Sequence, residues 1–263
     1  MNKWTKMSID YANQRNYLDE LFKVYPTIPE GLRDIDKVAW ANVERHFKQK
    51  NNQGLIKGLL DLDLFPLKDS YVAYLRRDSG AIARNPETVN RLCGRMYEMG
   101  LDVMYARCSE AKETNRQIGP MFRDWIRRGS IGVPVLDQGK FLRASGNCIL
   151  DASDNVMMEF ARKHVGYEGD KGLDFVGRFG GKFVIGEAKF LTDFGGHQNA
   201  QFEDAKKVLA DKAKAVKVAI LDGVLYIEGG RGGGNKMFRY LIQNREEHNV
   251  LSSLVLNEFL FSI

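Results

Sequence analysis

The amino-acid sequence predicts an α/β fold, in which helices flank a mixed β-sheet and a largely helical region precedes it. Apolar side chains recur at helical spacing through most of residues 1–128, whereas strand-like and helix-like segments alternate in residues 129–263. Residues 172–190 have the pattern of two strands joined at a Gly-Gly turn. No Pro, Gly and Ser-rich linker divides the chain, so we expect one compact domain overall.

The region 1–128 is expected to be mainly helical. Pro26, Pro86 and Gly100 stand where helices would stop or start. Helices or helical turns are expected over residues 8–24, 31–50, 55–65, 69–77 and 86–99. Nothing in them suggests catalysis, and Met96 and Met99 are typical of core filling.

The segment 112–129 combines an apolar stripe with a cationic ridge. The apolar stripe consists of Ile118, Met121, Phe122, Trp125 and Ile126. The cationic ridge, on the opposite face of the segment, consists of Lys112, Arg116, Arg123 and Arg127. Such a ridge suits a phosphate backbone, but it equally fits a solvated outer face. If Pro120 starts a new helix, only Arg123 and Arg127 share a face.

Residues 129–263 are expected to form the α/β core. Residues 130–150 look irregular with short strands, and a helix over 151–165 is closed by Gly166. After the hairpin we expect a helix over 198–215, a core strand over 216–221, a possible strand over 224–227 and a helix over 237–247.

The hairpin places charged residues inside apolar strands. Asp174 lies in the first strand, and Glu187 and Lys189 share one face of the second with Phe183 and Ile185. Burying a carboxylate and an ammonium costs several kcal/mol each, which favours a functional reason. The alternative is an exposed ribbon with a Glu187–Lys189 surface salt bridge worth roughly 0–1 kcal/mol, which the apolar residues on both faces disfavour.

Two carboxylates and a lysine on a rigid sheet suit phosphodiester hydrolysis. Asp174 and Glu187 would supply oxygen ligands to Mg²⁺, with the Ala188 carbonyl as an extra ligand. Lys189 would hold the attacking water or the phosphate and offset the charge of the transition state. A lysine so close to a metal ion is expected to have a depressed pKa.

The arrangement of Asp174, Glu187 and Lys189 resembles the PD-(D/E)XK nuclease superfamily, and among its members the type II restriction endonucleases. The three residues have the usual spacing, on a hairpin that follows one helix and precedes another. Leu173 stands where the family usually has a proline. By position, the resemblance also implies a metal-site role for Glu159 on the preceding helix.

The resemblance covers about residues 150–221 and implies a restriction-endonuclease-like catalytic core within 129–263. It implies Mg²⁺-dependent cleavage of double-stranded DNA at a short specific site, leaving 5′-phosphate ends. It further implies a homodimer, DNA-backbone or dimer contacts from residues 1–128, and a companion DNA methyltransferase in the same system.

Other candidate residues are weaker. The glycine-rich loop 228–236 lacks the ending of a P-loop, but Arg231, Asn235 and Lys236 in it could contact DNA; a plain surface connection is the alternative. His197, which follows two glycines near the hairpin, could touch the substrate, although a loop or helix-start histidine explains it equally. No histidine pattern for zinc or serine catalysis is present.

The composition is compatible with this interpretation. A hydrophobic fraction of 44% and a charged fraction of 28% are ordinary for a globular protein, and a net charge of +5 permits a polyanionic partner. The sequence shows no membrane span or signal peptide, and its three separated cysteines fit a reducing cytoplasm. Two alternatives stay open: another nuclease of the same superfamily acting in repair or recombination, and a catalytically inactive DNA-binding module.

Overall fold

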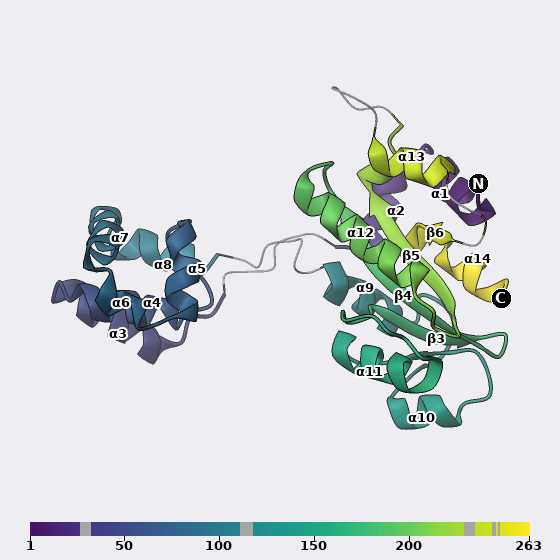
Figure 1. Ribbon diagram of the computed structural model, residues 1–263, viewed down its shortest axis with the longest axis horizontal. Helices are drawn as coiled ribbons and strands as arrows, with labels where there is room; N and C mark the ends of the chain where they lie inside the picture. The colour runs from purple at the N-terminus through teal and green to yellow at the C-terminus, as the bar shows by residue number, and fades with distance from the viewer. Residues whose placement is uncertain (27–32, 111–117, 229–234, 244–245, 247) are drawn as a thin grey trace. The chain divides into compact units, whose positions relative to one another are not determined.

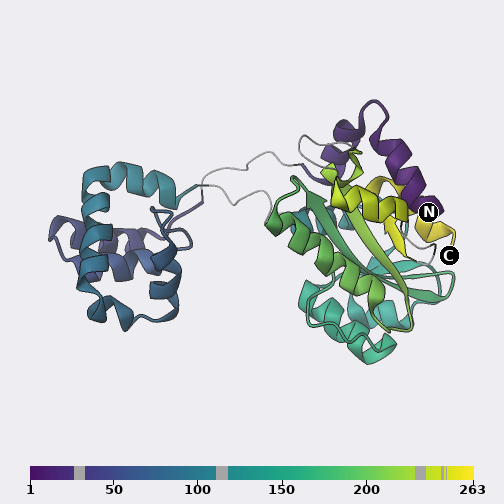
Figure 2. The same cartoon turned by 45° about the horizontal axis from the view of Figure 1, so that its top comes forward.

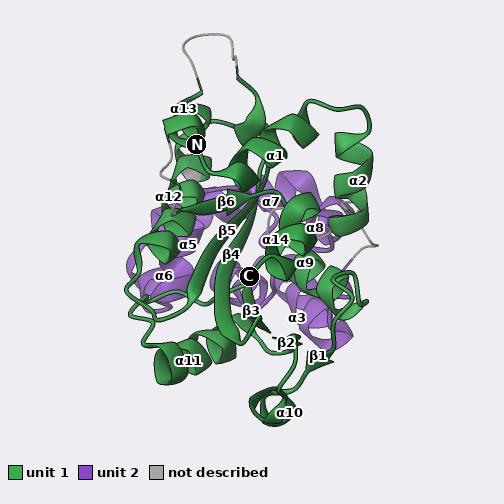
Figure 3. Ribbon diagram, turned by 90° about the vertical axis from the view of Figure 1, so that its right-hand side faces the viewer, with its two compact units in different colours: residues 1–27, 114–263 green, residues 28–113 purple. Residues whose placement is uncertain are grey.

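The computed structural model describes residues 1–26, 33–110, 118–228, 235–243, 246 and 248–263, without the side chain of His197 (Figure 1). The chain forms two compact units, one made of Met1–Thr27 and Thr114–Ile263 and the other of Ile28–Glu113 (Figure 3). Each unit has a hydrophobic core of its own.

The unit Ile28–Glu113 is helical. Its core is formed by side chains such as Val43, Leu59 and Met96, each fully buried. Side-chain oxygens of Asp36, Asn51 and Asp69 accept the first free N–H groups of three of the helices. The helices are α3 (Lys37–Lys48), α4 (Asn52–Leu60), α5 (Ser70–Arg77), α6 (Ala81–Arg84), α7 (Pro86–Met99) and α8 (Leu101–Cys108).

The other unit is built on a mixed six-stranded sheet in which the strands follow one another in chain order. The pairs β2–β3 and β3–β4 are antiparallel, and the remaining three pairs are parallel. The strands are β1 (Val135–Leu136), β2 (Cys148–Leu150), β3 (Phe175–Phe179), β4 (Lys182–Leu191), β5 (Val216–Gly223) and β6 (Asn249–Leu251).

Helices cover this sheet, and α12 lies along β4 and β5 (Figures 1 and 2). The mixed α/β class predicted from the sequence is therefore confirmed. The described residues of this unit also form the short 3₁₀ turns η2 (Val224–Tyr226) and η3 (Ser253–Val255). The helices are α1 (Lys3–Ala12), α2 (Tyr17–Val24), α9 (Ile118–Arg127), α10 (Gln138–Arg143), α11 (Asp154–Val165), α12 (Gly196–Ala210), α13 (Lys236–Gln243) and α14 (Leu256–Phe261).

Strand β4 alternates between two core clusters, as its sequence predicts. Val184 and Ala188 pack in a cluster with residues of α9 and α12, whereas Ile185 packs with residues of α10 and α11. The turn before β4 is made by Gly180 and Gly181, whose φ angles are 53° and 78°. The hairpin is thus an interior part of the sheet.

Three details differ from the sequence-based expectation. The helix expected over 8–24 is broken into α1 and α2, with Asn16 in the left-handed region before α2. Residues 224–226 form η2 instead of a strand, after Gly223 turns the chain at a φ of 98°. The boundary between the units falls at 28 and 113 instead of 128, because residues of α1, α2 and α9 pack into the core of the sheet.

No helix of the described residues is both long and apolar enough to cross a membrane. Cys93, Cys108 and Cys148 are buried and free, which agrees with the absence of a disulfide framework expected from the sequence.

Candidate active site

Asp174 and Glu187 lie opposite each other on the hairpin. Phe175 pairs with Gly186 at the start of β3, and the Asp174 N–H donates to the Gly186 carbonyl at 3.1 Å. One residue beyond that pair, the register brings Asp174 against Glu187. The side chains are 8% and 7% exposed, so two carboxylates are buried side by side at the end of this strand pair.

Lys189 joins the two carboxylates. Its Nζ lies 3.3 Å from Asp174 Oδ2 and forms an ion pair with Glu187 Oε1. The Ala188 N–H donates to Asp174 Oδ2 at 3.1 Å. With only 23% of the Lys189 side chain exposed, this is a buried cluster, and the exposed-ribbon alternative does not hold.

Burial sets the electrostatics of the cluster. Desolvation, followed by the charge of Asp174, raises the pKa of Glu187 to about 7, while Lys189 acts in the opposite direction. For Lys189, burial favours the neutral amine, but the charges of Asp174 and Glu187 outweigh it and the pKa is raised. The depressed pKa expected for this lysine concerns a lysine beside a bound metal ion and stays a prediction, whereas here both carboxylates stabilise the ammonium.

The donor set fits a hard divalent cation. Glu187 Oε2 is buried and has no hydrogen-bond partner among the described residues. Glu187 also lines a pocket of about 150 Å³, together with Asp204 and Lys171. No group of three or more His, Cys, Asp or Glu ligands occurs in the described part of the chain. Mg²⁺ does not need such a group, because it commonly uses one or two carboxylates and keeps several waters.

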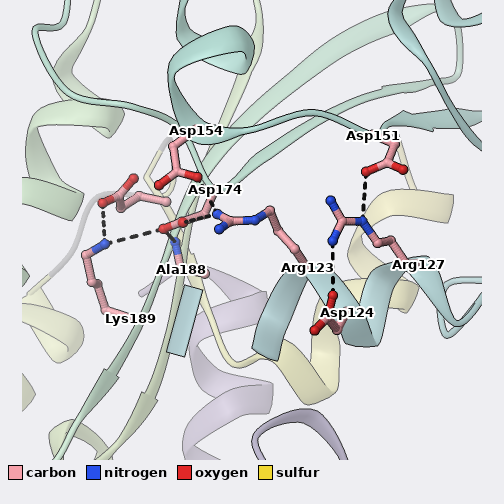
Figure 4. Close-up of polar contacts among 9 residues, drawn as sticks. Arg123, Asp124, Arg127, Asp151, Asp154, Asp174, Ala188 and Lys189 are labelled. Atoms are coloured by element: carbon pink, nitrogen blue, oxygen red, sulfur yellow. Dashed lines mark hydrogen bonds and ion pairs between the residues drawn. The ribbon is translucent and has the colours of Figure 1, made fainter. Parts of the chain in front are cut away.

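Arg123 approaches Asp174 from α9. Its Nη1 lies 3.4 Å from Asp174 Oδ1 and 2.6 Å from Asp154 Oδ1, and the side chain is 16% exposed. Figure 4 shows Arg123 and Lys189 reaching Asp174 from opposite sides. Gly119, in the first turn of α9, lets this helix approach, since a Cβ there would lie 3.1 Å from Asp174 Oδ1.

Sequence reasoning missed Asp154 and placed Arg123 on a ridge facing away from the core. Asp154 is the first residue of α11 and is half-exposed. An acidic residue at a helix start is common because the helix dipole favours it, so the position of Asp154 in the sequence does not distinguish it as a site residue. Arg127, one turn after Arg123, pairs instead with Asp124 at 3.0 Å and Asp151 at 2.8 Å.

Glu159 is not brought to the cluster by any contact of the described residues. Its side chain is 68% exposed and pairs with Arg162 on the same helix at 3.1 Å. It follows Asp154 by five residues on α11, which places it about 140° around the helix.

The remaining candidates lie in the loop 228–236, in α12 and before α9. Asn235 is buried: its amide nitrogen donates to three carbonyls before α13, and its oxygen accepts from Met237 N and Phe238 N. Capping α13 explains this residue without a DNA contact. Lys236 is exposed at the start of α13. Lys112, Arg116 and Arg231, and the side chain of His197, lie outside the described part of the structure.

No curated protein and no solved structure matches the chain. A protein-family model does match it, over residues 2–263, and that model describes the Tsp45I type II restriction enzyme. The match includes both compact units and every residue of the carboxylate cluster. Because the family model matches nearly the whole chain, including the hairpin with its two opposed acids and its lysine, the chain belongs to the Tsp45I type II restriction enzyme family.

Proposed function

We propose that the chain cleaves double-stranded DNA at a short recognition sequence in a Mg²⁺-dependent reaction that leaves 5′-phosphate ends, and that Asp174, Glu187 and Lys189 carry the reaction. The observation that carries this proposal is the opposition of Asp174 and Glu187, with Lys189 paired to both. The same arrangement supports placing the chain in the PD-(D/E)XK superfamily.

Asp174 and Glu187 would hold the cation. Glu187 Oε2 would be the first ligand, because it is buried and has no hydrogen-bond partner among the described residues, and the Asp174 carboxylate and the Ala188 carbonyl would be further ligands from the same hairpin. When bound, Mg²⁺ supplies positive charge that stabilises the phosphate oxygens and lowers the pKa of water.

Lys189 would act on the substrate directly. In the cluster its ammonium pairs with both carboxylates. With a cation held by the two carboxylates, the ammonium would be able to donate to a non-bridging phosphate oxygen or to orient the attacking water. A positively charged ammonium at this place suits stabilisation of a transition state with added negative charge.

Glu159 has no part in this proposal, because its carboxylate is exposed and paired with Arg162. Arg123 and Lys236 would contact the phosphate backbone. One such site cuts one strand, so symmetric cleavage would need a homodimer. We also infer a cytoplasmic location and a companion methyltransferase that protects the host's own sites.

Plasmid digestion with Mg²⁺ or with EDTA tests the proposal. Discrete fragments that appear only with Mg²⁺ are expected, and sequencing their ends gives the recognition sequence and the cleavage offset. Nicking or smearing would indicate another type of nuclease, and binding without cleavage would indicate a DNA-binding module. Glu159→Gln should cut at the rate of the natural chain and serves as the carboxylate control.

A further inference from the structure

We propose that Arg123 is a positioning residue that couples divalent-cation binding to DNA binding: it pairs with Asp174 until a DNA phosphate draws it away. This inference rests on the proposed function, because it assumes that Asp174 is a cation ligand. Arg123 would control whether Asp174 is free to bind the cation.

The contacts show that both oxygens of Asp174 are in use. Oδ2 accepts from Ala188 N at 3.1 Å and lies 3.3 Å from Lys189 Nζ, and Oδ1 lies 3.4 Å from Arg123 Nη1. Lys189 has Glu187 as its second partner, whereas Arg123 has Asp154. A cation that binds Asp174 Oδ1 must therefore displace the guanidinium.

The charges decide how strongly Arg123 opposes a cation. The cluster holds the carboxylates of Asp154, Asp174 and Glu187 against the positive groups of Arg123 and Lys189. A guanidinium within a few ångströms of a ligand oxygen repels a divalent ion, and only 16% of the Arg123 side chain is exposed, so solvent screens this repulsion poorly.

Asp154 gives the guanidinium a second position. Its Oδ1 is closer to Arg123 Nη1 than Asp174 is, at 2.6 Å against 3.4 Å, and its side chain is 51% exposed, against 8% for Asp174. Arg123 can thus release the buried Asp174 while it stays paired with Asp154 at the edge of the site. A DNA phosphate reaching that edge offers two oxygens to the guanidinium, a geometry that arginine favours.

Two binding events linked in this way strengthen each other. DNA that pulls Arg123 outward raises the affinity for the cation, and by thermodynamic linkage the cation raises the affinity for DNA by the same factor. The site would then stay poorly loaded with metal until DNA is bound.

Calorimetric titration of the full chain with Mg²⁺, without DNA, tests the competition directly. Arg123→Gln should bind Mg²⁺ at least about fivefold more tightly than the natural chain, and Arg123→Lys, which keeps the charge, should not. Arg127→Gln is the matched control, since this arginine lies one turn further along α9 and pairs with Asp124 and Asp151. An unchanged or weaker affinity in a folded Arg123→Gln chain overturns the proposal.

Asp154→Asn supplies a test of opposite sign. Without its second partner, Arg123 should hold Asp174 more firmly and weaken Mg²⁺ binding, whereas the double variant with Arg123→Gln should bind as Arg123→Gln does alone. If Asp154→Asn weakens binding equally in both backgrounds, Asp154 is itself a cation ligand and the positioning role is overturned. These titrations need no cleavage, so they can fail while plasmid digestion succeeds, and the reverse.

The coupling between cation binding and DNA binding is measured as the affinity of the chain for a labelled duplex with and without Ca²⁺, which prefers oxygen ligands as Mg²⁺ does. Ca²⁺ should tighten DNA binding by the natural chain and do so clearly less for Arg123→Gln. Equal tightening in both chains would contradict the coupling.

Discussion

Asp174, directly before β3, lies opposite Glu187 of β4, and both carboxylates are buried. Two like charges buried side by side destabilise each other, and Lys189 offsets only part of the cost, so that the pKa of Glu187 is raised by burial and by Asp174. The cluster therefore stores a repulsion that a divalent cation would relieve.

This repulsion predicts a pH-dependent stability of the metal-free protein. Because the pKa of Glu187 is about 7 in the folded chain against an ordinary value of 4.5, the folded state binds more protons than the unfolded state between these values. The free energy of unfolding should fall as pH rises through this range, by up to about 3 kcal/mol.

Urea unfolding at pH 5 and pH 8, without divalent cations, measures the effect. Glu187→Gln should remove most of the pH dependence and be the more stable chain at pH 8, and Glu159→Gln should behave as the natural chain does. If Glu187→Gln keeps the full pH dependence, the repulsion lies elsewhere.

We predict that the close approach of β4 to β5 at Gly186 is needed to hold Glu187 in place. A Cβ at this position would lie 2.7 Å from Val218 Cγ1 and 2.9 Å from the Val218 carbonyl oxygen, so Gly186→Ala must shift the strand that carries Glu187. We expect a loss of roughly 1–3 kcal/mol in stability and slower cleavage.

Gly94→Ala is the control for that substitution. Nothing lies within 4 Å of a Cβ at Gly94 on α7, so alanine should raise stability by up to about 1 kcal/mol. Thermal melts of both variants decide the comparison, and a Gly186→Ala chain as stable and active as the natural one would show that the strands adjust freely.

Tyr25 is predicted to anchor the end of α2 to the sheet. Its hydroxyl donates to Asp222 Oδ2 at 2.9 Å, its ring packs edge-on against Phe190 of β4, and Asp222 is fully buried. Tyr25→Phe should cost about 1–3 kcal/mol, because a buried carboxylate loses a donor. Tyr71→Phe, on an exposed ring, should have no effect in the same denaturation experiment.

Arg123 is predicted to contribute to binding of any DNA sequence. If its guanidinium meets a phosphate, Arg123→Ala should lower the affinity for all duplexes and reduce the slope of log affinity against log salt by about 0.9. Fluorescence anisotropy over a range of salt concentrations measures this slope. The same slope in the variant and the natural chain would mean that Arg123 pairs only within the protein.

The hairpin could be predicted from sequence because its signals are local. Gly180 and Gly181 supply the left-handed turn, and the two-residue period of β4 fixes which side chains share a face. The opposition of Asp174 and Glu187 then follows from the turn position alone.

Other features depend on contacts between distant segments, which one sequence does not reveal. Arg123 meets Asp174 across 51 residues of chain, and no spacing rule connects them. Pro26, Pro29 and Gly31 lie at the first boundary of the separate unit Ile28–Glu113, but such residues also end helices within one domain, so they do not reveal a second unit by themselves. The segment after Gly223 has strand-forming residues, but the turn there and burial of Leu225 and Tyr226 favour η2.

The most direct test of the account is single-turnover cleavage of a DNA fragment bearing the recognition sequence by Asp174→Asn, Glu187→Gln and Lys189→Ala, beside Arg127→Gln. The account predicts that the first three variants bind the fragment but lose at least about 100-fold in cleavage rate, while Arg127→Gln still cuts. Cleavage at the natural rate by any of the first three would contradict the role assigned to that residue.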